Sequence, residues 1–203
     1  MLEKRPVDRR TAKTKAAIRN ALAEALKKKD LQKITVQEIV DKADISRVTF
    51  YKYYLDVYDL YDHIEKEMMI KMSVIVLELA EGTTEDFFRK LTEYIYDNRI
   101  TFEMIFSENA TNKLRDKLSK LIEGTFKKIY SEKLGVDMDD KEIAYISCYR
   151  SNVFISVIQK WIQGGFLESH EDIVKPIAAL DAAVERFFSD NKEKLKKPGK
   201  TKK

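Results

Sequence analysis

The sequence is poor in helix-breaking residues and in metal-binding ones. It has six glycines, three prolines, one cysteine and two histidines in 203 residues. A single cysteine excludes both an internal disulfide and a zinc site built from several thiolates, and two histidines disfavour a histidine-rich metal site. We therefore expect a reducing compartment, no metal and no cofactor. Cys148, His63 and His170 are assigned structural roles.

Long apolar runs are also missing. No segment approaches the roughly 20 consecutive apolar residues of a membrane-spanning helix, and the charged start at residues 1–5 leads into no signal-peptide core. We expect a cytoplasmic protein with no membrane partner. The sequence has no Ser/His/Asp arrangement, glycine-rich phosphate loop or HExxH motif, so we expect that it is not an enzyme.

Charge is distributed unevenly. Residues 1–54 hold 14 Lys and Arg against seven Asp and Glu, and residues 191–203 hold seven Lys against one Glu, although the whole chain is only +4. The segment between them is therefore acidic. A basic head favours a polyanionic partner, although such charges also simply solvate helix faces. We predict a DNA-binding domain at 1–54, an effector and dimerisation domain at 55–190, and a basic disordered tail at 191–203.

Apolar residues recur at helical spacing, which predicts an all-α fold. Ile18, Leu22 and Leu26 form one ridge of a first helix over residues 8–28. Pro176 is expected to kink the last helix or to begin a new one. The other long helices, which make up a C-terminal helical-bundle regulatory and dimerisation domain, are predicted at 56–81, 84–97, 99–106, 109–134, 139–163 and 169–189.

Two short helices are predicted close together near the N-terminus. Thr35 and Glu38 have the spacing of a capping box, which begins a helix. Ser46 is a good N-cap for a second helix over 47–54, after a turn of three or four residues. Phe50 and Tyr54 are four residues apart and are expected to face inward. With the first helix, these elements predict a three-helix helix-turn-helix domain.

These residues resemble the TetR family of bacterial transcription regulators. The resemblance covers residues 10–68, about a third of the chain, and is carried by ITVQEI at 34–39 and SRVTFYKYY at 46–54. WIQGGF at 161–166 is similar to a subgroup that includes regulators of dihydroxyacetone kinase genes. Two positions depart from the family pattern: Asp44 replaces a common turn glycine, and Val57 stands where a phosphate-binding lysine is common.

The resemblance implies a homodimer that binds a double-stranded DNA operator. Arg47, Thr49 and Lys52 are predicted to read base edges in the major groove, and Gln37 to reach a base. The full set of predicted contact residues is Thr35, Gln37, Ser46, Arg47, Thr49, Tyr51, Lys52 and Tyr53. For Tyr51 and Tyr53 the alternative role is helix packing. Further phosphate contacts are assigned to Lys13, Lys15 and Arg19, whose alternative is a solvated face.

The sequence of the predicted second domain, residues 55–190, suggests a dimer interface and an effector pocket. The resemblance implies that the last two long helices pair with their copies, through the stripes Ile143, Ile146, Val153, Val157, Trp161 and Ile173, Ile177, Leu180, Val184, Phe187. The predicted pocket comprises Tyr94, Phe102, Phe126, Tyr145, Tyr149, Arg150 and Phe154, unless these side chains are simply core. A buried Arg150 needs a partner, either an anionic effector or an internal carboxylate such as Glu93 or Glu123.

We therefore predict a sequence-specific DNA-binding transcriptional regulator, controlled by a small-molecule effector or a protein co-regulator. Repression is the family's commoner mode, and activation stays open. The alternative is a helical adaptor or co-regulator that acts mainly through protein contacts of its C-terminal domain. The sequence leaves the operator, the effector and the regulated genes open.

Overall fold

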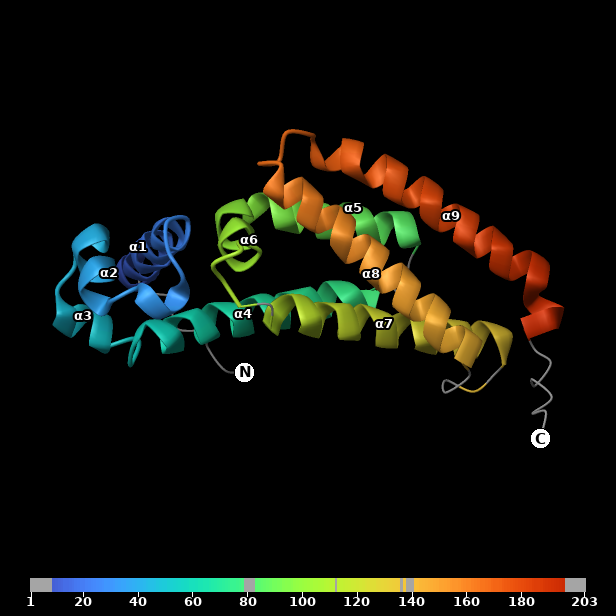
Figure 1. The fold of residues 1–203 in the computed structure, drawn as a ribbon, viewed down its shortest axis with the longest axis horizontal. Helices are drawn as coiled ribbons and strands as arrows, with labels where there is room; N and C mark the ends of the chain where they lie inside the picture. The colour runs from blue at the N-terminus through green and yellow to red at the C-terminus, as the bar shows by residue number, and fades with distance from the viewer. Residues whose placement is uncertain (1–8, 79–82, 112, 136, 138–140, 196–203) are drawn as a thin grey trace. The chain divides into compact units, whose positions relative to one another are not determined.

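The computed structural model describes residues 9–78, 83–111, 113–135, 137 and 141–195. Within these ranges the chain forms nine α-helices, one 3₁₀ turn and no strand (Figure 1). The all-α prediction is confirmed. The chain divides into two compact units, one of Met1–Met68 with Asn98–Asn112 and one of Met69–Asp97 with Lys113–Lys203. Helix α4 (Val57–Glu78) begins in the first and ends in the second.

The first unit contains the three-helix head. The head consists of α1 (Arg9–Leu26), α2 (Val36–Ala43) and α3 (Arg47–Tyr51). The 3₁₀ turn η1 (Leu31–Lys33), the start of α4 and α6 (Arg99–Ile105) complete the unit. Helix α1 packs against α2 and α6, and α2 packs against α3. Ile18, Leu22 and Leu26 are fully buried, which confirms the predicted ridge. The Asn109 side-chain N–H donates to the Leu26 carbonyl at 2.9 Å. Leu26 is the last residue of α1, so its carbonyl has no hydrogen-bond partner within the helix.

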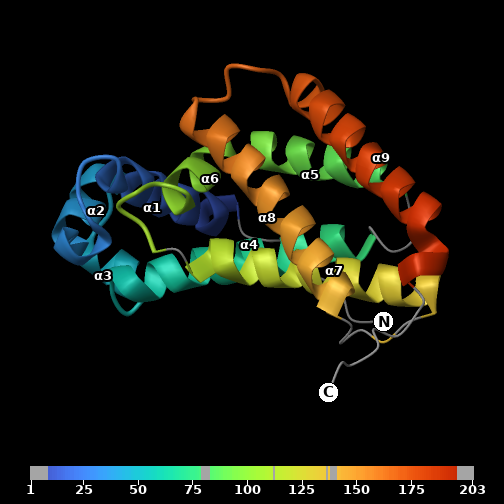
Figure 2. The ribbon, with the colours of Figure 1, turned by 45° about the vertical axis from the view of Figure 1, so that its right-hand side comes forward.

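The second unit is a helical bundle. It consists of the end of α4 with α5 (Thr84–Asp97), α7 (Lys113–Leu134), α8 (Lys141–Gln163) and α9 (His170–Leu195). Helix α5 packs against α9, α7 packs against α8, and α8 also contacts α9 (Figure 2). Its core is mainly aromatic and aliphatic: Phe88 stacks on Phe154 with ring centroids 4.9 Å apart. Burying such surface is the main favourable contribution to folding.

Several predicted boundaries need correction. Helix α3 ends at Tyr51 rather than at residue 54. Helix α9 runs through Pro176 as one helix and continues to Leu195, so residues 191–195 of the predicted disordered tail are helical. Residues 196–203 of that tail, the predicted end of the 56–81 helix at residues 79–81 and the predicted start of the 139–163 helix at residues 139–140 lie outside the described residues. The boundary at residue 54 stays a prediction, although the compact unit around the head extends to Met68.

Candidate DNA-binding surface

The start of α2 is fixed by a complete capping box. The Thr35 hydroxyl accepts from the Glu38 backbone N–H at 3.3 Å, and a Glu38 carboxylate oxygen accepts from the Thr35 backbone N–H at 2.9 Å. Lys29 pairs with the same carboxylate. Lys29 and the Thr35 N–H together lower the pKa of Glu38 to about 2. The Thr35 hydroxyl therefore holds the helix start, and its phosphate contact stays a prediction.

The turn after α2 depends on Asp44. This residue has φ 52° and ψ 52°, the left-handed conformation that usually selects glycine. The Ile45 N–H then donates to the Val40 carbonyl at 3.1 Å and closes the turn. Aspartate tolerates this conformation better than most residues, which explains how Asp44 can stand at a turn position where glycine would be expected.

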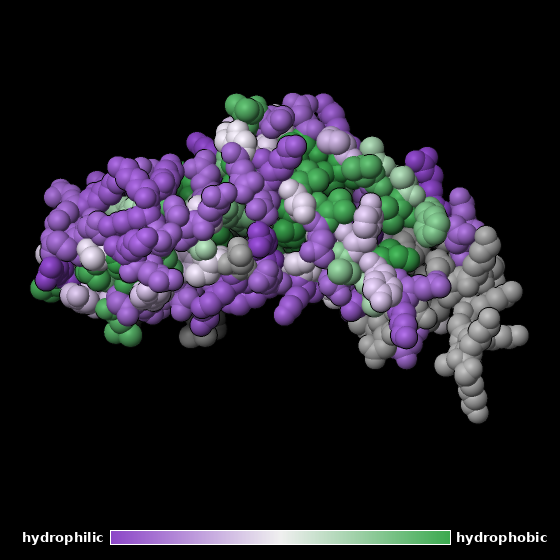
Figure 3. Space-filling view, viewed as in Figure 1, coloured by the Kyte–Doolittle hydropathy of each residue, from purple (hydrophilic) through white to green (hydrophobic). Residues whose placement is uncertain are grey.

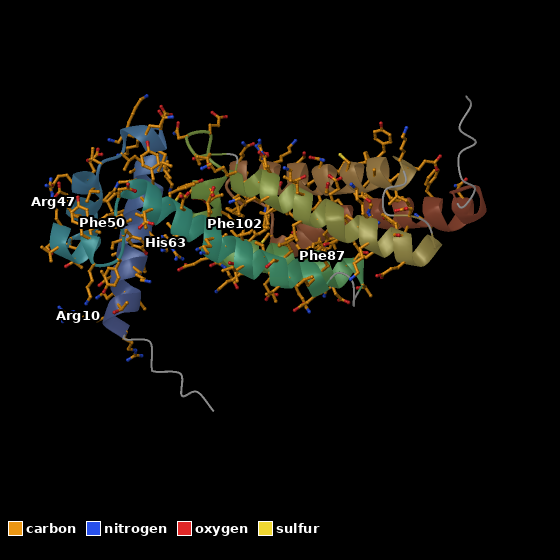
Figure 4. All side chains as sticks on the ribbon, turned by 90° about the horizontal axis from the view of Figure 1, so that it is seen from below. Arg10, Arg47, Phe50, His63, Phe87 and Phe102 are labelled. Atoms are coloured by element: carbon orange, nitrogen blue, oxygen red, sulfur yellow. The ribbon has the colours of Figure 1, made fainter. Side chains whose placement is uncertain are left out.

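The orientation of α3 follows from one cap and one buried ring. The Ser46 hydroxyl accepts from the Thr49 N–H at 3.1 Å, as predicted for an N-cap. Phe50 is fully buried and packs against Tyr54, with ring centroids 5.8 Å apart. Arg47 lies at the outer edge of the head (Figure 4). With Phe50 anchored inside, the opposite face of this five-residue helix is presented to solvent.

Val48 is the most prominent residue that the sequence analysis missed on this face. It is 81% exposed, which is unusual for a β-branched apolar side chain. The signal was present in the spacing, because residues two apart in a helix point about 200° apart, and Phe50 is buried. An exposed valine beside Arg47 and Thr49 offers methyl groups rather than hydrogen bonds.

Arg47 and Gln37 join α3 to α2. The Arg47 Nε–H donates to Gln37 Oε1 at 2.7 Å, and Gln37 Nε2 donates to Asp41 Oδ1 at 2.5 Å. Gln37 therefore contacts Arg47 and Asp41, so its predicted base contact would require it to leave them. The three exposed side chains form a continuous chain of hydrogen bonds across the surface.

Two lysines of the head lie over the ring of Tyr53. Lys15 Nζ lies 5.7 Å and Lys52 Nζ 5.8 Å from the centroid of its ring, one lysine from α1 and the other from the end of α3. Arg19 instead pairs with Glu67 on α4, with 2.6 Å between the charged atoms. Val57 is buried, so the position where the resemblance would place a phosphate-binding lysine belongs to the core. Lys15 and Lys52 are therefore better placed than Arg19 to meet a phosphate.

The second unit contains a cavity of about 420 Å³ between α8 and α9. Four of the predicted effector residues line it: Phe126, Tyr149, Arg150 and Phe154. The other three do not. Tyr94 lies on α5 away from the lining, Tyr145 is exposed on α8, and Phe102 is buried on α6 in the first unit.

Arg150 is buried at this cavity and is held by carboxylates. It pairs with Asp181, and its Nη1 donates to Glu185 Oε1 at 2.8 Å. Its guanidinium carbon lies 4.1 Å from the centroid of the Phe126 ring. Burial raises the pKa of Asp181, with Arg150 acting in the opposite direction. An internal carboxylate was predicted correctly, but Glu93 and Glu123 were the wrong choices because the partners come from α9.

Apolar side chains gather along α8 and α9 (Figure 3), where exposed residues also line the cavity. Tyr149, Val153, Leu180 and Phe187 are all exposed there. Within the predicted stripes, Ile143 and Trp161 on α8 and Ile177 on α9 are instead buried, and the Trp161 indole N–H donates to the Glu168 carbonyl at 2.9 Å. The part of each stripe that another molecule can reach is therefore smaller than predicted.

Two features are absent from the described part of the chain. None of its helices is long and apolar enough to cross a membrane. Nor do its described His, Cys, Asp and Glu side chains form a group of three that is suited to a metal ion.

Residues 82–180 match the family model described as the C-terminal region of transcriptional regulators. Three solved structures share the fold. The dihydroxyacetone kinase operon activator DhaS is 19% identical, with a TM-score of 0.57 over 86% of this chain and 97% of its own. The fatty acid degradation regulator FadR from Bacillus halodurans is 14% identical, with a TM-score of 0.60 over 88% and 96%. A TetR transcriptional regulator from Streptococcus agalactiae 2603V is 20% identical, with a TM-score of 0.55 over 85% and 96%. No curated protein matches the sequence.

Proposed function

Because the chain belongs to the TetR family of transcriptional regulators, we propose that it binds a double-stranded DNA operator through α3 and represses transcription there. The observation that carries this proposal is the presentation of α3: Phe50 is buried, while Arg47 and Val48 are exposed on the helix surface. The second helix of a helix-turn-helix enters the major groove with its N-terminal residues at the base edges. Arg47 and Val48 occupy that end of α3.

The contacts divide by chemistry. Arg47 is suited to guanine O6 and N7, while Val48 and the Thr49 methyl group are suited to thymine methyl groups. Lys15 and Lys52, gathered around Tyr53, supply charge for phosphates, with Ser46 and Tyr51 as neutral partners. Because the usual lysine is replaced by buried Val57, a larger share of the affinity rests on base contacts.

A homodimer is proposed through α8 and α9. Exposed apolar side chains gathered on one surface are typical of a protein interface. Leu180 and Phe187 on α9, with Tyr149 and Val153 on α8, supply such a surface. Two copies bring two recognition helices to one operator, which multiplies the affinity of either alone.

The cavity between α8 and α9 is proposed as the site of a small-molecule effector. The charged residues of its lining are Arg150 and Asp181, which form an ion pair with one another. Glu185 forms a second ion pair with the Arg150 guanidinium. An uncharged, mainly apolar ligand is therefore favoured over a carboxylate. We expect 1-decanol to raise the melting temperature more than decanoate at equal concentration. A larger effect of decanoate, or none from either compound, would count against this assignment.

The test of DNA binding is the double variant Arg47→Ala with Thr49→Ala. We expect operator affinity to fall at least a hundredfold, because a bidentate guanine contact and a second base contact are both lost. Arg89→Ala, an exposed arginine of α5 that is paired with Glu85, is the control for charge. Sedimentation should show the same dimer for all three proteins. Unchanged operator affinity in the double variant would remove α3 as the reading helix.

Measuring DNA affinity at several salt concentrations separates the regulator from the alternative adaptor function. A DNA-binding regulator loses affinity steeply as salt rises, because bound phosphates release counterions. An adaptor would show no DNA binding and a protein association that is insensitive to salt.

A further inference from the structure

We propose that Gln37 and Asp41 are positioning residues, which hold the Arg47 guanidinium ready to read guanine without touching a base themselves. This inference rests on the proposed DNA-binding function. It replaces a direct base contact by Gln37 with an indirect role, and it extends the recognition machinery to Asp41, an acidic residue on α2.

The first step is the use of the Arg47 donors. Its single Nε–H is bound to Gln37 Oε1 at 2.7 Å. A guanidinium has five N–H donors, so four remain on the two terminal nitrogens. Bidentate recognition of guanine O6 and N7 needs one N–H from each of two nitrogens. The bond to Gln37 therefore fixes the side chain and leaves both terminal nitrogens available.

The second step is the orientation of the Gln37 amide. Its Nε2 donates to Asp41 Oδ1 at 2.5 Å, between residues four apart on α2. With the donor end held by Asp41, the acceptor end faces Arg47. If Asp41 were replaced by a residue that accepts no hydrogen bond, the amide would be free to turn its N–H groups toward Arg47. Donor would then oppose donor, and the guanidinium would lose its support.

The third step is the opposite effect of Asp41 on affinity and on specificity. A carboxylate on a DNA-facing surface repels phosphates, so its charge weakens binding to every sequence. As the anchor of Gln37, it favours the one arrangement of Arg47 that reads guanine. A side chain ordered before binding also loses less conformational freedom on binding. Removing the carboxylate should therefore strengthen general DNA binding while weakening the preference for guanine.

The DNA test uses a duplex selected by the wild-type protein from a random library. Copies of this duplex carry 7-deazaguanine, which lacks the N7 acceptor, at one guanine at a time. We expect one such replacement to lower wild-type affinity about tenfold. Asp41→Ala should bind an unrelated duplex more tightly and should reduce that tenfold loss to less than threefold. Asp41→Asn, which keeps an acceptor oxygen without the charge, should also bind the unrelated duplex more tightly but retain the tenfold loss.

Two comparisons can overturn the inference. In an Arg47→Ala background, Asp41→Ala and Gln37→Leu should have no further effect on guanine discrimination. A further effect there, full discrimination in Asp41→Ala, or equal loss in Asp41→Asn and Asp41→Ala would each contradict the positioning role. So would a wild-type protein that is insensitive to every guanine replacement.

A measurement without DNA separates this inference from the proposed function. In the free protein, the Arg47 Nε–H should exchange with water at least threefold more slowly than in Gln37→Leu and in Asp41→Ala, as followed by ¹⁵N NMR. Equal exchange rates would show that the hydrogen-bond chain does not hold Arg47, even if DNA binds. Slow exchange in a protein that selects no duplex would overturn the DNA-reading role together with the proposed function.

Discussion

Asp44 shows how one backbone angle constrains the head. The left-handed conformation at φ 52° costs most L-residues roughly 1–2 kcal/mol and costs glycine nothing. We expect Asp44→Gly to change the free energy of unfolding by less than about 1 kcal/mol, and Asp44→Val to lower it by about 1–2 kcal/mol. Urea denaturation followed by circular dichroism measures both. Asp62→Val, on the exposed side of α4, is the control, and an equal loss there would contradict the assignment.

Individual residues differ in how far the sequence predicts them. Phe50 and Tyr54 were predicted to face inward because their spacing is local, and both are buried. The partners of Arg150 were wrong because they depend on which helix packs against α8, and that is decided by contacts between residues far apart in the chain. The role of Gln37 depends in the same way on the approach of α2 to α3.

At the scale of single elements, α2 gives a pH-dependent prediction. Lys29 and the capping box lower the pKa of Glu38 from 4.5 to about 2. The ionised carboxylate therefore stabilises the folded state above pH 4.5, and this contribution is lost as the pH falls toward 2. We expect Glu38→Gln to lower the melting temperature at pH 7. The difference from wild type should shrink steadily between pH 4.5 and 2, whereas a constant difference would show that the charge contributes nothing.

The extent of each helix was predictable where caps and apolar spacing agree. Helix α5 has the predicted limits, residues 84–97, and the capping box begins α2 as expected. Helix α3 is shorter than its pattern because the chain tightens after it: the Tyr53 N–H donates to the Phe50 carbonyl, three residues back, at 2.9 Å. Exposed Pro176 does not interrupt α9. The packing of α9 therefore outweighs the tendency of an interior proline to break a helix.

At the scale of the whole molecule, the exposed faces of α8 and α9 predict the oligomeric state. Leu180 is 60% exposed on α9, so a glutamate there should leave the single chain folded. We expect Leu180→Glu to raise the dimer dissociation constant at least tenfold in sedimentation experiments, which corresponds to about 1.4 kcal/mol. Leu167→Glu, at an 85% exposed position between α8 and α9, is the matched control. A dimer unaffected by Leu180→Glu would place the interface elsewhere.

The fold class and the helix-turn-helix elements could be predicted because both rest on patterns within short segments. The cavity could not be predicted as fully, because its walls come from α5, α7, α8 and α9. Phe102 illustrates the limit. Its aromatic character fitted a pocket, but α6 places it in the core of the first unit.

The most direct test of DNA recognition by α3 is the selection of duplexes from a random library by the purified full-length protein. The account predicts an inverted repeat, with half-sites centred about ten base pairs or a multiple of ten apart, as expected when two copies meet the major groove. The Arg47→Ala protein should fail to enrich the guanine that the wild type selects. Enrichment of no sequence, or of the same sequence by both proteins, would contradict the account.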